Sequence, residues 1–273
     1  IVLDIRLNTL DKFVDYFVIV ESRFTHSGAI KELKFDINKF KKFENKIIYL
    51  IFDDVPNEVK NIDINEDKEE SVKIQIMNAF YRETYQRNYI SKGLDKALDN
   101  DVIMISDIDE IPKLDNVDLS ISNKKIIMFQ QEMYYYKLNL KLPNVKWVGT
   151  KACKLKNFKT PQWLRNIKDR KYKFFRIDTL FSDKKYRNIK ILNDGGWHFT
   201  NIKTPDQLAY KLKSYLHHTE FDKKFFKISD IKNIMKNKKA IYDLKADQRI
   251  DKVGEGPSLV KTELITLPKY SFR

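Results

Sequence analysis

The chain has 273 residues with 42% hydrophobic and 13% aromatic content, enough for a packed core in one large domain or two small ones, which argues against disorder. Its formal net charge of +14 favours acidic partners such as nucleic acid, an anionic membrane or phosphorylated small molecules, although the lysines are dispersed rather than grouped in blocks. The single cysteine excludes a disulfide framework and a cysteine-rich zinc site, and no apolar run approaches the roughly 20 residues of a membrane span.

Apolar runs rich in β-branched and aromatic residues predict the first strands of the chain. They cover residues 14–22 (VDYFVIVES), 45–54 (NKIIYLIFDD), 101–107 (DVIMISD) and 124–137 (KKIIMFQQEMYYYK). Apolar residues at helical spacing predict a helix over about residues 69–98, weakened locally by Gly93. Near-continuous apolar strands and a β–helix–β order predict an α/β fold with a mostly parallel central sheet flanked by helices.

Shorter segments follow residue 137. The stretches 145–155 and 187–194 are strand-like, and a helix is predicted to open at Thr204 as N-cap, with Pro205 in its first turn. The tail 254–273 contains two glycines and two prolines and is typical of a strap. We therefore expect one α/β domain over residues 1–273 with C-terminal elaborations.

Three acidic residues come directly after the third predicted strand. Asp107 and Asp109 should project to one side of an extended chain with Ile108 turned towards the core, and Pro112 should end the strand. Buried carboxylates are costly unless they are paired or hold a metal, and hard divalent cations prefer carboxylate oxygen. The pattern therefore indicates a metal site that could hold a diphosphate, although a solvated acidic turn is the simpler alternative.

Two enzyme classes place an Asp-x-Asp motif after an apolar strand. One is the haloacid-dehalogenase-type phosphohydrolases, in which Asp107 would be the nucleophile, and the other is the nucleotide-sugar glycosyltransferases of the GT-A type. Ile111 and the two preceding strands favour the transferase, because the phosphohydrolases place Thr or Val at that position and the motif near the start of the domain. A basic nucleic-acid-binding module is a third possibility, but no Lys/Arg helix stripe supports it and no nucleic-acid partner is expected.

Several segments together resemble glycosyltransferase family 17. They are the opening block LDIRLNTLDKFVDYFVIVESRFTHSG (3–28), YQRNYISKGL (85–94), DVIMISDIDEIP (101–112), GGWHFT (195–200) and LHHTEFD (216–222). The resemblance implies a GT-A-like nucleotide-sugar-binding fold and inverting transfer of a sugar, with GlcNAc expected, from a UDP-sugar donor to a glycan acceptor. It also implies a divalent metal, Mn²⁺ or Mg²⁺.

The same resemblance predicts how the chain is divided by function and where the protein is located. Residues 1–135 would form the nucleotide-sugar-binding half, and residues 136–273 the acceptor half and strap. Location depends on the source: cytoplasmic for a microbial or viral member, the Golgi lumen for a eukaryotic member whose N-terminal anchor lies outside this sequence.

Metal and donor contacts can be assigned to individual residues. The predicted metal ligands are Asp107, Asp109, His198 and His218. The predicted donor contacts are Glu21, Lys31, Arg87, Asn88, Asp107 and Trp197. For several of these a structural role is the alternative: an ion pair for Arg87, a hydrogen-bonded structural role for each histidine, and core packing for Trp197 and for Trp147.

An inverting transfer also requires a carboxylate that takes the proton of the acceptor hydroxyl. Asp194, which precedes two glycines that could let the backbone approach a ligand, is the first candidate, and Glu220 is the second. Asp222 and Glu132 are rivals, and Asp194 could instead serve as a turn former.

Overall fold

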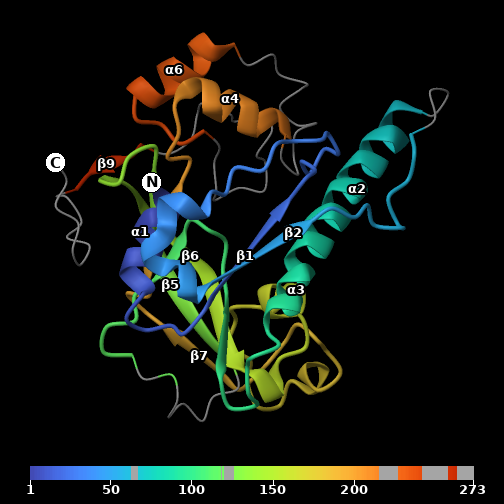
Figure 1. Cartoon of the computed structure of the whole chain (residues 1–273), viewed down its shortest axis with the longest axis vertical. Helices are drawn as coiled ribbons and strands as arrows, with labels where there is room; N and C mark the ends of the chain where they lie inside the picture. Colours follow the sequence, from blue (N-terminus) through green and yellow to red (C-terminus); the bar gives the residue numbers. More distant parts are fainter. Residues whose placement is uncertain (63–66, 118, 120–125, 215–226, 242–257, 263–273) are drawn as a thin grey trace. The chain divides into compact units, whose positions relative to one another are not determined.

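The computed structural model describes residues 1–62, 67–117, 119, 126–214, 227–241 and 258–262 (Figure 1). The chain divides into two compact units, each assembled from separate stretches of sequence. The first unit comprises Ile1–Tyr16, Leu94–Ile202 and Val260–Arg273, and the second comprises Phe17–Gly93 and Lys203–Leu259. The predicted division of function near residue 135 stays a prediction.

The first unit contains a seven-stranded mixed sheet built around β5 (Ile126–Tyr135). One edge of β5 pairs antiparallel with β6 (Leu140–Lys154), and the other pairs parallel with β7 (Ile189–Leu192) and then β8 (Gly196–Thr200). The remaining strands are all antiparallel to their partners: β3 (Val102–Ile105) and β9 (Val260–Lys261) on β6, and β4 (Glu110–Pro112) on β8.

The prediction of a mostly parallel central sheet was therefore wrong, because most of these pairings are antiparallel. The chain leaves β5 through residues 136–139 and returns directly as β6, whereas a parallel connection needs a crossover of a dozen residues or more. The expected parallel β–helix–β crossover also fails, since β2 pairs with β1 and β3 pairs with β6. The apolar run of β5 indicates only that the strand is buried along nearly its whole length. It does not indicate whether the neighbouring strands are parallel or antiparallel to β5.

Two helices of the first unit, α1 (Val2–Leu10) and α3 (Pro161–Asn166), were not predicted. The buried residues of α1 do not follow a clean helical period, but Ile5 packs into a core cluster with Ile111, Tyr134 and Phe199. The helix α3 carries a local start signal, because the Thr160 side chain accepts a hydrogen bond from the Trp163 amide and Pro161 opens the helix.

The second unit contains the parallel pair β1 (Phe17–Ser22) and β2 (Ile47–Phe52), linked through η1 (Ile37–Lys46). The long helix α2 (Lys68–Asn88) ends ten residues earlier than predicted and continues as the 3₁₀ helix η2 (Tyr89–Gly93). A Cβ on Gly93 would lie 2.6 Å from Val18 Cγ1, so glycine lets η2 pack closely on β1.

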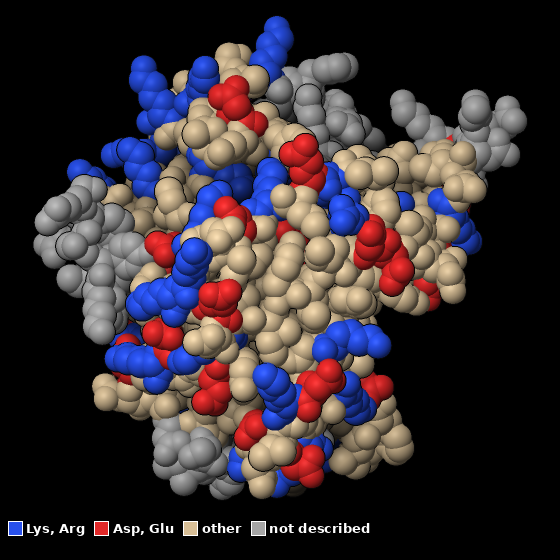
Figure 2. Space-filling view, viewed as in Figure 1, with Lys and Arg blue, Asp and Glu red and all other residues tan. Residues whose placement is uncertain are grey.

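Two further helices complete the described part of the second unit, α4 (Pro205–Ser214) and α6 (Ile228–Lys236), which lie side by side in Figure 1. The predicted N-cap is confirmed, since the Gln207 amide donates to Thr204 Oγ1 at 3.3 Å. Across the described residues, every helix is too short or too polar to cross a bilayer. On the face shown in Figure 2, Lys and Arg side chains lie interspersed with Asp and Glu.

Glu21, at the end of β1, closes the loop that follows the strand. Its carboxylate accepts hydrogen bonds from the backbone amides of Lys34 and Phe35 at 2.8 and 3.0 Å, and from the Tyr49 hydroxyl at 3.0 Å. Lys31 adds an ion pair at 3.3 Å. Burial alone would raise the pKa of Glu21, but these donors outweigh it and hold the pKa below its ordinary value.

The substitution Glu21→Gln should lower the free energy of unfolding at pH 7 by about 1–3 kcal/mol, because charge-assisted hydrogen bonds to a partly buried carboxylate are lost. A depressed pKa contributes stability above the unfolded value near 4.3, and that contribution disappears as pH falls through the folded value. The difference from wild type, measured by urea unfolding, should therefore shrink below about pH 4. The exposed Glu32→Gln is the control, and a pH-independent difference would contradict this account.

Candidate active site

The acidic motif lies in a turn between two strands. β3 ends at Ile105, the Glu110 amide donates to the Asp107 carbonyl at 3.1 Å, and β4 begins at Glu110. Ile108 is 52% exposed, so the expectation that it turns towards the core was wrong. The turn replaces the extended conformation that the alternation rule assumes. Pro112 does end a strand, but that strand is β4.

Glu110 is the buried centre of the site. Its side chain is fully buried and accepts hydrogen bonds from Arg165 Nη1 at 2.8 Å and Nη2 at 3.1 Å, and from Trp147 Nε1 at 2.7 Å. The backbone amide of Asp107 donates to it at 3.0 Å. Burial raises the pKa of Glu110 and the Asp107 carboxylate adds to the rise, whereas Arg165, His198 and Trp147 oppose it.

Gly149 on β6 leaves the space that Glu110 occupies. A Cβ at this position would lie 2.4 Å from the carboxyl carbon of Glu110 and 2.5 Å from Gln131 Oε1. The carbonyl of Gly149 also accepts a hydrogen bond from Arg165 at 2.5 Å. The glycine is therefore required by packing around a fixed carboxylate, and its φ angle is not in the left-handed region.

Arg165, near the end of α3, connects Glu110 to the acidic turn, because its Nη2 also lies 3.0 Å from Asp107 Oδ2. Lys151 on β6 holds the backbone of this region, with Nζ donating to the carbonyls of Arg165 and Ile167, both at 2.6 Å. Helix ends leave such carbonyls without helical partners, so the ammonium caps α3 and fixes Arg165. Burial, reinforced by the Arg165 charge, lowers the pKa of Lys151 to about 8.

Arg6 of α1 holds the turn from another side. Its Nη1 donates to the Glu110 carbonyl at 2.5 Å and its Nη2 to Ser106 Oγ at 2.6 Å. The guanidinium is thus hydrogen-bonded to main-chain and hydroxyl oxygens, and it fixes the backbone conformation of the acidic motif.

His198 and Asp109 lie together, as the metal-site prediction requires. His198 stands opposite Glu110 in the β4–β8 pairing, and its Nε2 is 3.5 Å from Asp109 Oδ1. Burial opposes protonation of the imidazole, but Asp109, Glu110 and Asp107 outweigh it and raise the pKa of His198 above its ordinary value. The Trp147 ring packs 5.1 Å from the imidazole, whose buried Nδ1 has no hydrogen-bond partner among the described residues.

The carboxylates of the motif are not equivalent. Glu110 is enclosed by donors, and Asp107, although 43% exposed, is bound to Arg165 at 3.0 Å. Asp109 is 25% exposed and its contact with His198 has the long distance of 3.5 Å. Within the described ranges, no group of three or more His, Cys, Asp or Glu residues is arranged to hold a metal. Asp109 is therefore the carboxylate of the motif with the longest ion-pair contact, and Asp107 is the most exposed one.

The predicted base Asp194 lies elsewhere in the first unit. It occupies a left-handed turn with φ 55°, its side chain is 74% exposed, and it pairs with Lys113 at 2.5 Å. Lys113 directly follows β4 and Asp109 directly precedes it, so about 10 Å of strand separates the two positions. The structure therefore does not bring Asp194 beside the acidic turn.

The neighbouring residues of the GGWH motif have packing roles in the structure. A Cβ on Gly195 would lie 2.7 Å from the Gln130 amide, and one on Gly196 would lie 2.2 Å from the Ile111 carbonyl, so both glycines permit close contact with other strands. Trp197 packs, partly buried, on the core cluster that contains Ile111. The rival base Glu132 is paired with Lys141.

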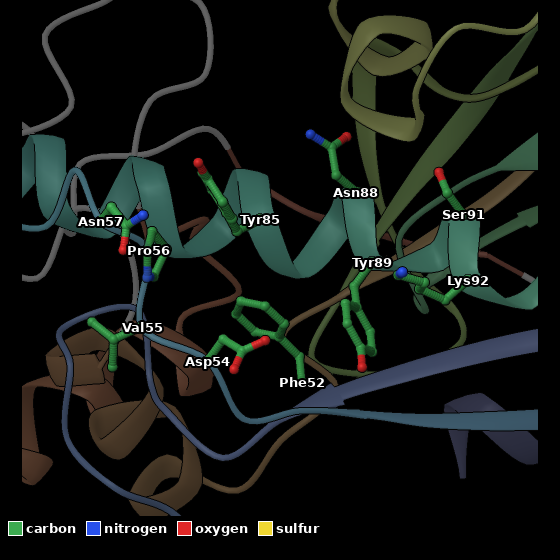
Figure 3. Close-up of a pocket in the computed structure, with 10 residues that line it drawn as sticks. All are labelled: Phe52, Asp54, Val55, Pro56, Asn57, Tyr85, Asn88, Tyr89, Ser91 and Lys92. Atoms are coloured by element: carbon green, nitrogen blue, oxygen red, sulfur yellow. The ribbon is translucent and has the colours of Figure 1, made fainter.

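The predicted donor contacts of the second unit are engaged with protein groups. Glu21 and Lys31 pair with each other, and Arg87 pairs with Glu83 one helical turn away at 2.7 Å. Asn88 lines a pocket of about 480 Å³ (Figure 3). The pocket is further lined by Phe52, Asp54, Val55, Pro56, Asn57, Tyr85, Tyr89, Ser91 and Lys92. The predicted residues His218 and Glu220, and the rival Asp222, lie outside the described residues.

Sequence reasoning missed the buried cations of the site. Arg165, Arg6 and Lys151 were not singled out, and Glu110 was not expected to be the centre. The N-cap Thr160 with Pro161 would have indicated α3, but no local pattern shows that Arg165 meets a carboxylate 55 residues earlier in the chain.

Comparisons with known proteins agree with the resemblance that the motifs indicated. The model of the family "Glycosyltransferase family 17" matches residues 1–270. The chain belongs to glycosyltransferase family 17. It is similar to the beta-1,4-mannosyl-glycoprotein 4-beta-N-acetylglucosaminyltransferases of Rattus norvegicus and Homo sapiens, each 25% identical over 234 residues, and to that of Mus musculus, 24% identical over 234 residues.

These matches cover 78% of this family 17 chain and 40% of each relative, so the chain spans less than half of the length of the curated relatives it matches. No solved structure matches it. Family membership favours the transferase interpretation of the acidic motif over the phosphohydrolase interpretation.

The substitution Gly149→Ala should disrupt the site of this family 17 chain. The added methyl group meets a Glu110 carboxyl that Arg165 and Trp147 hold in place, so we expect a loss of about 1–3 kcal/mol in unfolding free energy. Thermal unfolding measures the loss, with Lys146→Ala on the same strand as an exposed control. Wild-type stability in Gly149→Ala would mean that the Glu110 carboxyl is free to move.

The substitution Lys151→Met should lower transfer activity about 10- to 100-fold, because Arg165 loses its backbone anchor and a small displacement of a positioning group is costly. The comparison variant Lys146→Met removes an exposed ammonium from the same strand and should leave activity unchanged. Equal activity in Lys151→Met and wild type would show that Lys151 has no part in positioning Arg165.

Proposed function

We propose that this chain is a metal-dependent, inverting glycosyltransferase that moves GlcNAc from a UDP-sugar donor to a glycan hydroxyl. The observation that carries the proposal is the pair of partly exposed carboxylates Asp107 and Asp109 beside the buried Glu110–Arg165 ion pair, in a chain of family 17. We further propose a single functional domain with a GT-A-like arrangement, in which residues 1–135 serve the donor and residues 136–273 the acceptor.

The donor and acceptor classes come from the relatives. Their names specify transfer of N-acetylglucosamine to a mannosyl glycoprotein. For this chain we take UDP-GlcNAc as the donor and a mannose-containing glycan as the acceptor.

The acidic turn offers carboxylate oxygens, which are suitable ligands for a hard divalent cation. Ions such as Mg²⁺ are commonly held by one or two carboxylates together with substrate phosphates and water, so a three-residue protein site is not required. Asp109 would be the main ligand, with Asp107, which is 43% exposed, as the second and His198 as a further candidate. Bound there, Mn²⁺ or Mg²⁺ would neutralise charge on the leaving diphosphate.

The other residues of the site prepare this position. Arg165 neutralises Glu110 and steadies Asp107, Arg6 fixes the backbone of the turn, and the Trp147 indole fills the space beside His198. Asp109 is left with a partly exposed carboxylate in a turn that these contacts hold in place, which is the arrangement that binding sites need.

Within the second unit, the pocket is proposed to bind a nucleobase. The Tyr89 ring, which is only partly buried, offers an apolar face to a planar base, and the buried Phe52 ring packs against it with centroids 5.4 Å apart. Asp54 and Asn88 offer hydrogen-bonding groups. Figure 3 shows these two rings on the same side of the α2–η2 helix as Asp54. Glu21, Lys31, Arg87 and Trp197 remain proposed donor contacts.

The proton of the acceptor hydroxyl must pass to a carboxylate. Asp194 stays the first candidate because its side chain is exposed, and Glu220 stays the second. The role of His218 as a metal ligand likewise stays a proposal.

The substitution Asp109→Asn tests the proposal. It should reduce transfer from UDP-GlcNAc by at least about 100-fold and abolish the Mn²⁺-dependent thermal stabilisation by UDP-GlcNAc, because the neutral amide is a poor ligand for a hard cation. Asp115→Asn, which removes a partner of the Lys12 ion pair in the same unit, is the matched control. An unchanged metal-dependent shift in Asp109→Asn, or no shift with any UDP-sugar in wild type, would contradict the proposal.

A further inference from the structure

The segment 168–188, between α3 and β7, exposes an unusual amount of apolar surface. Apart from the short 3₁₀ helix η4 (Ile177–Thr179), it has no helix or strand. Its large apolar side chains project into solvent: Phe174 is 84% exposed, Phe175 59%, Ile177 67%, Leu180 67% and Phe181 88%. Five large apolar side chains exposed within residues 174–181, two of them in ring contact, indicate an interaction surface.

Local contacts hold the segment in this shape. Arg187 Nη1 donates to the Phe174 carbonyl at 2.5 Å, and the buried Thr179 donates to the Arg176 carbonyl at 2.7 Å. The Tyr186 ring packs edge-on against Trp163 of α3 at 5.8 Å. The backbone is thus anchored while the apolar tips point outward.

The same segment is strongly basic. Residues 170–187 contain seven Lys or Arg and two Asp, a net charge of +5. Both aspartates are already paired, Asp178 with Arg176 and Lys185, and Asp183 with Lys159. Arg170, Lys171, Lys173 and Lys184, which are exposed, flank the apolar residues in the sequence as additional positive charge, and Lys173 lies over the Phe175 ring at 5.7 Å.

We propose that this segment docks the protein on an anionic lipid surface. Phe, Ile and Leu side chains can enter the headgroup–acyl boundary while Lys and Arg bind lipid phosphates and carboxylates above it. Charge complementarity selects this occupant over a second copy of the chain, since each copy carries +14 and would present the same basic segment. Single-stranded nucleic acid is a poorer match, because Ile177 and Leu180 offer no face for base stacking.

The experiment is co-sedimentation of the full chain with lipid vesicles and does not depend on transferase activity. We expect at least about tenfold stronger binding to phosphatidylcholine vesicles containing about 30% phosphatidylserine than to phosphatidylcholine alone. Raising the salt from about 0.1 M to about 0.5 M should weaken the binding, because electrostatic attraction to the headgroups is screened.

Two variants separate the apolar from the electrostatic contribution. Phe174→Ser with Phe181→Ser should weaken binding at least about tenfold, and Lys171→Glu with Lys173→Glu should do the same. The controls are Ile30→Ser, which removes an exposed apolar side chain of the second unit, and Lys236→Glu with Lys238→Glu, which reverses two charges on it. Circular dichroism establishes that each variant is folded.

The proposal is overturned if the vesicles bind wild type and the phenylalanine variant equally, because binding would then come from the general positive charge. It is also overturned if light scattering shows self-association that the phenylalanine variant loses, which would identify a second copy as the occupant. Binding of single-stranded RNA that both variants abolish, without lipid binding, would overturn it in favour of nucleic acid.

Discussion

The fully buried carboxylate of Glu110 is the constraint on which the acidic site depends. A buried carboxylate without a partner costs several kcal/mol, so the site requires a cation in the interior. Arg165 supplies this cation. The guanidinium stays in position only if the backbone of Arg165 is fixed, and Lys151 fixes it by capping the end of α3. Gly149 follows from the same constraint, because a side chain there would occupy the space of the carboxylate.

This arrangement divides the work among the acids of the motif. Glu110 is bound to donors in the interior, and Asp107 is exposed but bound to Arg165, while Asp109 is partly exposed and has a 3.5 Å contact with His198. An apolar strand can run into three acids because only one of them is fully buried, and that one is neutralised. Arg165 therefore offsets the cost of burying Glu110, and Asp109 remains the carboxylate proposed to bind a ligand.

The sequence predicted what depends on neighbours along the chain. The strands β1, β2, β3 and β5 and the Thr204 cap are confirmed because burial and capping leave local patterns. Strand direction was wrong, since it is decided by the short 136–139 connection and by pairing partners far along the chain. Asp107 and Asp109 were proposed from local spacing and stay a prediction, whereas the contact of Glu110 with Arg165 spans 55 residues and no local pattern encodes it.

The buried cations also bear on the need for a metal. A donor diphosphate carries negative charge that a transferase must neutralise as the bond to the sugar breaks. Arg165 is bound to two carboxylates and a carbonyl, Arg6 to the turn, and Lys151 to the end of α3. Releasing any of them to bind phosphate would leave a buried acceptor or a buried carboxylate unpaired, at a cost of several kcal/mol. In the proposed function, a divalent cation on Asp109 would add the positive charge without breaking these contacts, and this is the physical reason for proposing a metal in a site whose arginines already bind protein groups.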